Sequence, residues 1–331
     1  MLEKIKVSVP KSIEELLRKD ARDFRITKAS GEENLNAFIN ALVVHFYESF
    51  AADEERIREG IKKALSAVPE IYAQKAFEEL VRVFASGERE KQEGEKSVAL
   101  SFKPTKSSES VFIYIENVLL QNESLSSFYR RMFISYAQKT KNEREKIIHK
   151  ENYELLCRAI KKGCAVCISL ENGYVYNGVS LHSVTAAKDE MFNYVLAFSE
   201  KKNRTLRLAK IKTVSLLAQK SYIPDESRER LERQAACAAQ YPIYPSDDQP
   251  IKVRLTEKGK EMFERIYLYR PTPVSVEGDD YIFHCSASQV IYYFERFGAE
   301  ALVLSPKKIG KFMRNYYYYA LKKYRTVYKD D

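Results

Sequence analysis

The amino-acid sequence predicts a multidomain α+β protein, and three observations lead to that prediction. A strand followed by two amphipathic helices occurs twice before residue 143, two alternating strands with a cationic end follow at residues 193–211, and short strands alternate with helices from residue 251 onward. The chain has 331 residues, whereas a domain averages roughly 150, so several modules are expected.

The first module is expected at residues 1–50. Polar and β-branched residues alternate from Lys4 to Val9, which is typical of a half-buried strand, and Pro10 ends that strand. Two helices follow. The second has an apolar face of residues three or four apart: Leu35, Phe38, Ile39, Leu42, Val43 and Phe46. This order resembles a ribbon-helix-helix module, in which two strands pair across a dimer and their outward side chains enter the DNA major groove.

The resemblance assigns nucleic-acid contact to the outward strand positions Lys4, Lys6 and Ser8. A second interpretation stays open, because lysines on an edge strand also protect it from aggregation.

The same order returns at residues 96–142. Residues 98–103 alternate as a strand that a proline ends, and residues 34–38 and 124–128 occupy equivalent places. We therefore expect a tandem pair of ribbon-helix-helix units within one chain, with both strands in one sheet. The second strand offers Lys103 but otherwise mainly serine and alanine, which weakens the case for reading a palindromic operator.

Two segments are expected to join modules. Residues 51–95 predict a helical connector broken near Pro69, with a polar hinge at residues 87–94. Residues 224–250 are rich in proline, serine and charged side chains around a short helix, and they are expected to form a linker.

A small β-barrel with a leading helix is expected at residues 143–223. In residues 204–211 leucines alternate with polar side chains, so a two-residue period buries the leucines and turns a cation outward. The cations of this segment are Arg204, Arg207 and Lys210. They lie beside the strand of Tyr194, a combination that suits phosphate or base contacts, although a solvated barrel rim would have the same composition.

This segment resembles a divergent WYL domain, an Sm-like or SH3-like barrel of bacterial nucleic-acid-linked regulators. Asn193-Tyr194-Val195 stands at the triplet that names the family, Leu181-His182-Ser183 precedes it, and Leu206-Arg207-Leu208-Ala209-Lys210-Ile211 stands at its arginine-rich strand. The resemblance implies a nucleic-acid site on the barrel. The residues assigned to this site are His182, Asn193, Tyr194, Arg204, Arg207 and Lys210.

Residues 251–331 are expected to form a C-terminal α+β extension of ferredoxin-like type that mediates dimerisation. Strands and helices alternate there, and the last helix carries four consecutive tyrosines. Four consecutive side chains point around most of a helical turn, so they cannot all enter one core. A homodimer interface is favoured over stacking on nucleic acid. The residues assigned to it are Tyr316, Tyr317 and Tyr319.

The composition favours binding over catalysis. A formal net charge of +9 suits polyanionic partners, and the 23 tyrosines offer rings that can stack on bases. The sequence has no phosphate-binding loop, dinucleotide fingerprint, HExxH motif or nucleophile elbow, so we expect no enzyme and no catalytic residue. Cys164 and Cys167 have metal-binding spacing without a second pair, so no metal and no cofactor are expected.

Nothing in the sequence indicates a membrane partner. No run of 18 consecutive apolar residues occurs, and the five cysteines show no regular disulfide framework. A cytoplasmic protein is expected.

The order of the modules resembles that of the WYL-domain accessory proteins of type VI-D CRISPR systems, which are encoded beside a compact RNA-guided ribonuclease. The resemblance implies a homodimer that binds single-stranded RNA and stimulates RNA cleavage by the effector in antiviral defence. The alternative is a DNA-binding transcriptional regulator whose barrel senses a nucleotide or single-strand ligand.

Overall fold

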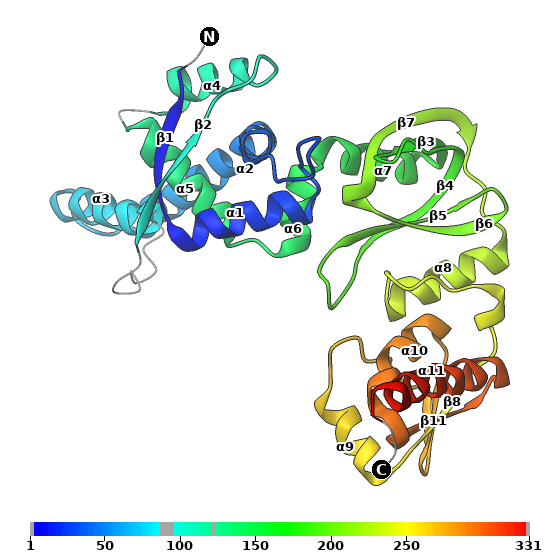
Figure 1. Ribbon diagram of the computed structural model, residues 1–331. Coiled ribbons are helices and arrows are strands. Elements are labelled where there is room, and N and C mark those ends of the chain that lie inside the picture. The colour runs from blue at the N-terminus through cyan, green and yellow to red at the C-terminus, as the bar shows by residue number, and fades with distance from the viewer. Residues whose placement is uncertain (1–2, 87–95, 121–122, 329–331) are drawn as a thin grey trace. The chain divides into compact units, whose positions relative to one another are not determined.

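The computed structural model of the chain describes residues 3–86, 96–120 and 123–328 (Figure 1). Within these residues the expected multidomain α+β class is confirmed, because helices accompany three separate antiparallel sheets. The chain divides into two compact units, residues 1–150 and 151–331, and each is described by itself. The polar hinge expected between the two strand-helix-helix copies lies outside the described residues.

Unit 1 is built on a two-stranded antiparallel ribbon, β1 (Ile5–Pro10) and β2 (Ser97–Phe102). Val7 lies opposite Leu100 in the middle of the register. The two strands thus lie in one sheet, as the tandem hypothesis requires. One face of the ribbon is buried, because side chains alternate along each strand. The buried strand residues are Val7, Val9, Leu100 and Phe102.

The helices of unit 1 are, in chain order, α1 (Lys11–Asp23), α2 (Leu35–Ala64), α3 (Glu70–Ser86), α4 (Glu109–Tyr114), the π-helical turn η1 (Ile115–Leu119), α5 (Leu125–Ala137) and α6 (Lys141–Ile148). Helices α1, α2 and α5 pack against the ribbon, and α3 and α6 pack against α2 (Figure 1). The two copies begin their second helix alike: Asn34 Oδ1 accepts from Ala37 N at 3.1 Å, and Ser124 Oγ accepts from Ser127 N at 3.2 Å. This equivalence agrees with the repeat expected from the sequence.

A buried charge on α1 fixes the last helix of unit 1. Asp20 is 1% exposed, and Arg144 of α6 donates from Nε to its Oδ2 at 2.6 Å. The hydroxyl of Tyr136 donates to the same oxygen at 2.9 Å. Because these contacts hold α6 in unit 1, that unit ends at Lys150, whereas the sequence predicts a boundary after residue 142.

Unit 2 begins with α7 (Lys150–Lys162) and a curved five-stranded antiparallel sheet (Figure 1). Its strands are β3 (Cys164–Leu170), β4 (Val175–Ala186), β5 (Asn193–Ser199), β6 (Lys202–Arg207) and β7 (Ile211–Lys220), with the 3₁₀ turn η2 (Leu208–Lys210) before the last. The order is β6-β5-β4-β3-β7, so within the described residues the two edge strands do not close the expected barrel by pairing. The inner face packs with α7 around Leu156, Ile168, Val195 and Leu206.

The segment expected to be a linker contains α8 (Asp225–Cys237), which covers the outer face of this sheet. Leu231 of α8 is buried against Leu196 of β5, and Gln234 Nε2 donates to Thr205 Oγ1 of β6 at 2.8 Å. Most side chains of α8 are polar, so the sequence gives little indication of the few apolar residues that pack against the sheet.

The C-terminal module follows a short 3₁₀ turn and has a four-stranded antiparallel sheet in the order β11-β8-β10-β9. Its elements are η3 (Pro245–Asp247), β8 (Ile251–Leu255), α9 (Glu257–Arg265), β9 (Ser275–Glu277), β10 (Asp280–Phe283), α10 (Ala287–Phe294), η4 (Glu295–Glu300), β11 (Ala301–Ser305) and α11 (Lys307–Val327). A β-α-β-β-α-β order with the fourth strand beside the first matches the ferredoxin-like arrangement that the sequence predicts.

Candidate nucleic-acid interface

The barrel residues that the sequence assigns to one site lie on two faces of the sheet. Side chains alternate in β6, so Arg204 shares a face with the buried Leu206, and Arg207 points the other way. The cross-strand partners agree: Arg204 lies opposite Ala197 of the inner core, and Arg207 lies opposite Tyr194 on the outer face. The expected grouping of these cations around one ligand is therefore not formed.

Arg207 and Tyr194 are engaged within the hairpin that joins β4 to β5. The guanidinium carbon of Arg207 lies 3.4 Å from the centre of the Phe192 ring. The hydroxyl of Tyr194 donates to Glu190 Oε2 at 2.7 Å. Both contacts stay inside the chain, so these residues stabilise the hairpin in this conformation.

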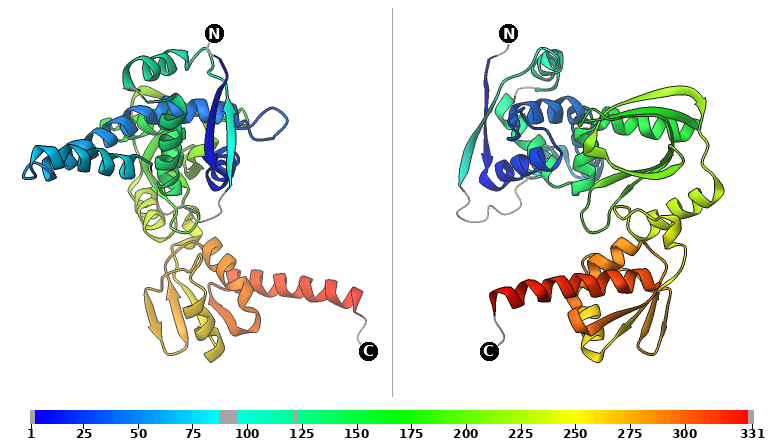
Figure 2. Two further views of the ribbon diagram at one scale, coloured as in Figure 1. Left: turned by 90° about the vertical axis from the view of Figure 1, so that its left-hand side faces the viewer. Right: turned by 45° about the vertical axis from the view of Figure 1, so that its right-hand side comes forward.

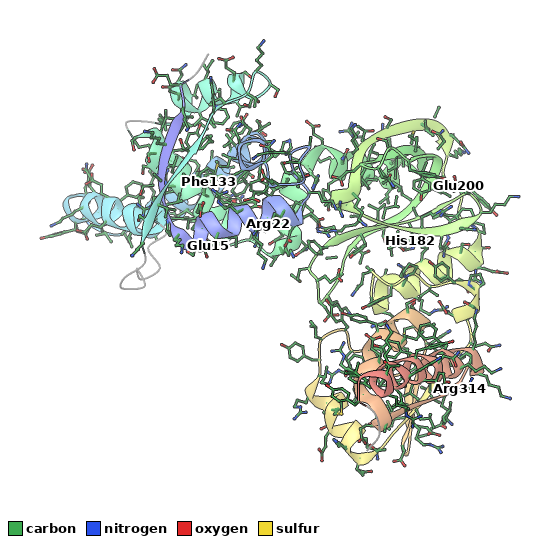
Figure 3. All side chains as sticks on the ribbon, in the orientation of Figure 1. Glu15, Arg22, Phe133, His182, Glu200 and Arg314 are labelled. Atoms are coloured by element: carbon green, nitrogen blue, oxygen red, sulfur yellow. The ribbon has the colours of Figure 1, made fainter. Side chains whose placement is uncertain are left out.

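His182 and Asn193 are withdrawn from the surface. His182 lies on the side of the sheet that faces α8, where its Nδ1 is 3.1 Å from Ser183 Oγ (Figure 3). Burial lowers the pKa of His182, and the nearby carboxylate of Glu232 on α8 partly opposes that shift. Asn193 is fully buried. Asn193 is therefore closed to a macromolecular ligand in this conformation, whereas His182 keeps part of its surface exposed.

Arg204 and Lys210 reach the rim of the sheet. Lys210 is exposed on the turn η2. Arg204 has a side chain that is 26% exposed and forms an ion pair with Glu200. Its guanidinium lies 5.2 Å from the centre of the Tyr176 ring. These two residues remain candidates for contact with a ligand.

The ribbon of unit 1, in contrast, gathers cations on one exposed face. Lys4, Lys6 and Ser8 are exposed on the side opposite to the core. Ile5, the first residue of β1, pairs with Phe102, the last residue of β2. Lys4 directly precedes Ile5, and Lys103 directly follows Phe102. Three lysines from two strands therefore meet at one end of the ribbon.

Two asparagines that the sequence reasoning missed hold this end in place. Asn36 Oδ1 accepts from Lys103 N at 2.7 Å, and Asn36 Nδ2 donates to Lys103 O at 3.2 Å. Asn40 Nδ2 donates to the same carbonyl at 3.0 Å, and its Oδ1 accepts from Thr105 N at 3.1 Å. The signal in the sequence is a pair of asparagines one helical turn apart at the edge of the apolar face of α2.

The other half of the exposed ribbon face is uncharged. Ser8, Ser97 and Ala99 stand there, and all three are exposed. Lys11, the first residue of α1, and Lys96, just before β2, flank that end and are exposed, but neither lies at an outward strand position. The outward-facing positions of the ribbon thus carry lysines at one end and none at the other.

The tyrosines of α11 divide between the core and the surface. The hydroxyl of Tyr317 donates to the carbonyls of Phe294 and Glu295 at 3.3 and 3.0 Å, so Tyr317 packs inside its own module. Tyr316 and Tyr319 are 47% and 62% exposed. Only two of the three tyrosines assigned to a dimer interface are therefore accessible.

Helix α11 continues past the end of its own sheet (Figure 2). Met313 is buried against that sheet. Leu321, Tyr324 and Tyr328 follow on the same side at steps of three or four residues, and they are 48%, 65% and 69% exposed. Tyr319 lies outside this stripe. Leu321, Tyr324 and Tyr328 are named the α11 stripe below.

Two kinds of site find no support in the part of the chain that the structure describes. No group of three or more His, Cys, Asp or Glu side chains could hold a metal ion there. No helix there is long and apolar enough to cross a membrane.

Comparisons with known proteins show the fold. No protein-family model and no curated protein matches the chain. A solved structure described as "Crystal structure of a CRISPR Cas-related protein" matches with a TM-score of 0.67 and 19% identity over 99% of this chain and 95% of that chain. The proteasome accessory factor B/C of Arthrobacter aurescens reaches a TM-score of 0.26 at 12% identity, over 70% of this chain and 39% of that chain. The first likeness shows a shared fold over nearly the whole chain, and the second is too low to bear on it.

Proposed function

We propose that the protein is a non-enzymatic accessory protein of a type VI-D CRISPR system, which binds single-stranded RNA and stimulates an RNA-guided ribonuclease. The likeness in fold to a protein described as CRISPR Cas-related supports the CRISPR association. The observation that carries the proposed binding of nucleic acid is the cationic end of the ribbon, formed by Lys4, Lys6 and Lys103.

Lysines on an exposed ribbon bind nucleic acid by neutralising phosphates and releasing their counterions. Asn36 and Asn40 fix the backbone at Lys103, so at least one of these cations is presented from a rigid position. The outer face of the barrel contributes less in this proposal, because Arg207 and Tyr194 are engaged with their own hairpin.

The uneven ribbon face favours a ligand without twofold symmetry. A palindromic duplex presents two equal half-sites, which equivalent residues of the two strands would read. When the two strands are superposed so that Val7 coincides with Leu100, Lys4 coincides with Ser97 and Lys6 coincides with Ala99. Since the two halves differ, single-stranded RNA fits this surface better than a palindromic operator.

A competition experiment tests the ligand. A labelled unstructured RNA of about 20 nucleotides is displaced by unlabelled RNA, by single-stranded DNA of the same sequence and by random duplex DNA at one fixed salt concentration, because affinities at different salt are not comparable. RNA is expected to compete best. Preference for the duplex would overturn the proposal.

A cleavage experiment tests the accessory role. The purified protein is added to a type VI-D effector with its guide, and the rate of target RNA cleavage is measured. The wild type is expected to raise the rate, and a variant with Lys4, Lys6 and Lys103 replaced by glutamine is expected to lose most of that effect. Lys63→Gln, at an exposed position of α2, is the matched control and should behave like the wild type.

A DNA-binding regulator is the second candidate, and one observation favours it. The two strands pair with their polar side chains outward, as in a ribbon-helix-helix module that enters the DNA major groove. This candidate requires preference for duplex DNA in the same competition.

A homodimer through α11 completes the proposal. The α11 stripe continues an apolar core face and stays exposed in this chain. A second copy offers the same stripe, so a twofold arrangement would cover both at once. The interface proposed is therefore Leu321, Tyr324 and Tyr328, with Tyr316 beside them, and it leaves out Tyr317 and Tyr319.

A further inference from the structure

Tyr174 and Arg204 hold the same carboxylate at the rim of the curved sheet. The hydroxyl of Tyr174 donates to Glu200 Oε1 at 3.0 Å, and Arg204 forms an ion pair with Glu200 Oε2. Figure 3 shows Glu200 at the outer edge of the sheet. A carboxylate held between a hydroxyl and a guanidinium occupies the kind of position in which a phosphate would also be bound.

Two aromatic rings lie directly beside these donors. The guanidinium of Arg204 stacks over Tyr176 at 5.2 Å from the ring centre, and the rings of Tyr174 and Tyr176 have their centres 4.5 Å apart. Tyr174 is 46% exposed, so one of its faces is open to a base. Stacking of bases on aromatic side chains and contact of cations with phosphates are the two components of single-strand binding.

One hydrogen-bond donor of Arg204 is not used. Its Nε is buried and has no hydrogen-bond partner among the described residues. A buried donor without a partner costs free energy, and Glu200 leaves this one unused because its second oxygen accepts from Tyr174. A phosphate has more acceptor oxygens, so it can accept from Tyr174 and from both Nε and Nη2 of Arg204.

Glu200 lies at the exposed tip of a hairpin. Glu200 and Lys201 form the two-residue turn between β5 and β6, with φ of 51° and 61°. Both positions favour asparagine or glycine, and such strain in residues with side chains is concentrated at functional sites. Glu200, Lys201 and Lys202 are all exposed, so the carboxylate can leave without disturbing the core while two lysines attract an anion.

We propose that Tyr174, Tyr176, Glu200 and Arg204, here named the Glu200 latch, form a binding site for one unpaired nucleotide. Its phosphate replaces the Glu200 carboxylate on Arg204 and Tyr174, and its base stacks on the exposed tyrosine ring. This inference rests on the proposed binding of single-stranded RNA and adds a subsite to it. Glu200 then acts as an internal competitor that weakens binding at this position.

The Glu200→Gln variant tests the competition. A labelled 20-nucleotide oligouridine is titrated at several salt concentrations and followed by fluorescence anisotropy. We expect about two- to fivefold tighter binding than in the wild type, since one exposed ion pair no longer competes. Glu261→Gln, which removes an exposed carboxylate from α9, is the control for net charge and should change affinity less than about twofold.

The two tyrosine variants test the stacking. Tyr174→Leu should bind oligouridine more weakly than Tyr174→Phe, because only the second variant keeps the ring. An abasic oligonucleotide of the same length should remove that difference.

The outcomes separate this inference from the proposed function. If RNA binds to the wild type and Glu200→Gln binds no better than Glu261→Gln, the latch is wrong and the proposed function stands. Equal losses for the two Tyr174 variants would overturn the stacking part. If neither the wild type nor Glu200→Gln binds any single strand, both proposals fall.

Discussion

Val7 lies opposite Leu100 at the centre of the ribbon, and the two side chains are 0% and 3% exposed. Val7 and Leu100 occupy equivalent positions in the two strands, and so do Val9 and Phe102. The two strands are therefore related by a pseudo-twofold axis that passes through the pair of Val7 and Leu100. One chain thus supplies both strands of the ribbon, whereas in a dimeric ribbon-helix-helix module each of two chains supplies one strand. The cationic end of that ribbon is the basis of the proposed function.

Replacing the central leucine should destabilise unit 1. Leu100→Ala leaves a cavity between the ribbon and its helices, so we expect a loss of about 2–5 kcal/mol in the free energy of unfolding. Urea denaturation followed by circular dichroism measures it. Ser101→Ala, at the exposed neighbouring position, should cost less than about 0.5 kcal/mol. Equal effects of the two variants would show that the ribbon is not packed on the helices.

The buried contact between Asp20 and Arg144 should be costly to break from one side. Asp20→Asn leaves Arg144 without its buried carboxylate, and a loss of about 3–5 kcal/mol in unfolding free energy is expected. In a double-mutant cycle, the free energy of unfolding is measured for Asp20→Leu, for Arg144→Met and for the double variant. The double variant should lose less free energy of unfolding than the two single variants together, because no charge is left unpaired. Strict additivity in this double-mutant cycle would contradict a direct contact.

The stability of unit 2 should fall in acid. The hydrogen bonds from Arg230, together with those from Arg233, lower the pKa of Asp248 from 3.8 to about 2. A carboxyl whose pKa is lower in the folded state stabilises that state above its unfolded pKa, and the effect is lost as pH falls through the folded pKa. The melting temperature should therefore drop between about pH 4 and pH 2.

Asp248→Asn tests this assignment by flattening that pH dependence. The flattening should be partial, because Arg254 lowers the pKa of Asp280 to about 2 as well, and Asp280 titrates in the same range. An unchanged slope in the Asp248→Asn variant would contradict the contribution of the arginine pair.

The α11 stripe should decide the oligomeric state. Leu321→Glu with Tyr324→Glu places charges on the proposed interface, so a dimer is expected to become a monomer in sedimentation equilibrium. Tyr319→Glu, on another side of the same helix, should leave the dimer intact. The reverse pattern would move the interface to the tyrosines that the sequence suggests. A wild-type monomer would exclude the interface altogether.

Periodicity in the sequence predicts most of the secondary structure and the faces of the strands. The alternation around Val7 and Leu100 gives the buried face of the ribbon, and the order of strands and helices after residue 251 gives the C-terminal topology. The repeat predicts the pairing of β1 with β2, because it makes the two strands equivalent.

The barrel site is predicted less well than the ribbon. The separation of Arg204 from Arg207 does follow from the sequence, because they are three residues apart, an odd spacing that places them on opposite faces of any strand. The contacts that the sequence does not reveal are tertiary. The pairing of Arg204 with Glu200 depends on a two-residue turn, and the cover of α8 depends on the buried Leu231 in a mostly charged helix. Contacts of this kind come from tertiary structure and leave only a faint pattern in sequence.

The salt dependence of RNA binding tests the central claim most directly. The affinity for oligouridine is measured at several salt concentrations for the wild type, for Lys63→Gln and for the variant with Lys4, Lys6 and Lys103 replaced by glutamine. With about 0.7 for each phosphate contact, the triple variant should bind more weakly and lose about 2 from the slope of log affinity against log salt. Lys63→Gln should match the wild type. An unchanged affinity and slope in the triple variant would contradict the account and place the interface elsewhere on the molecule.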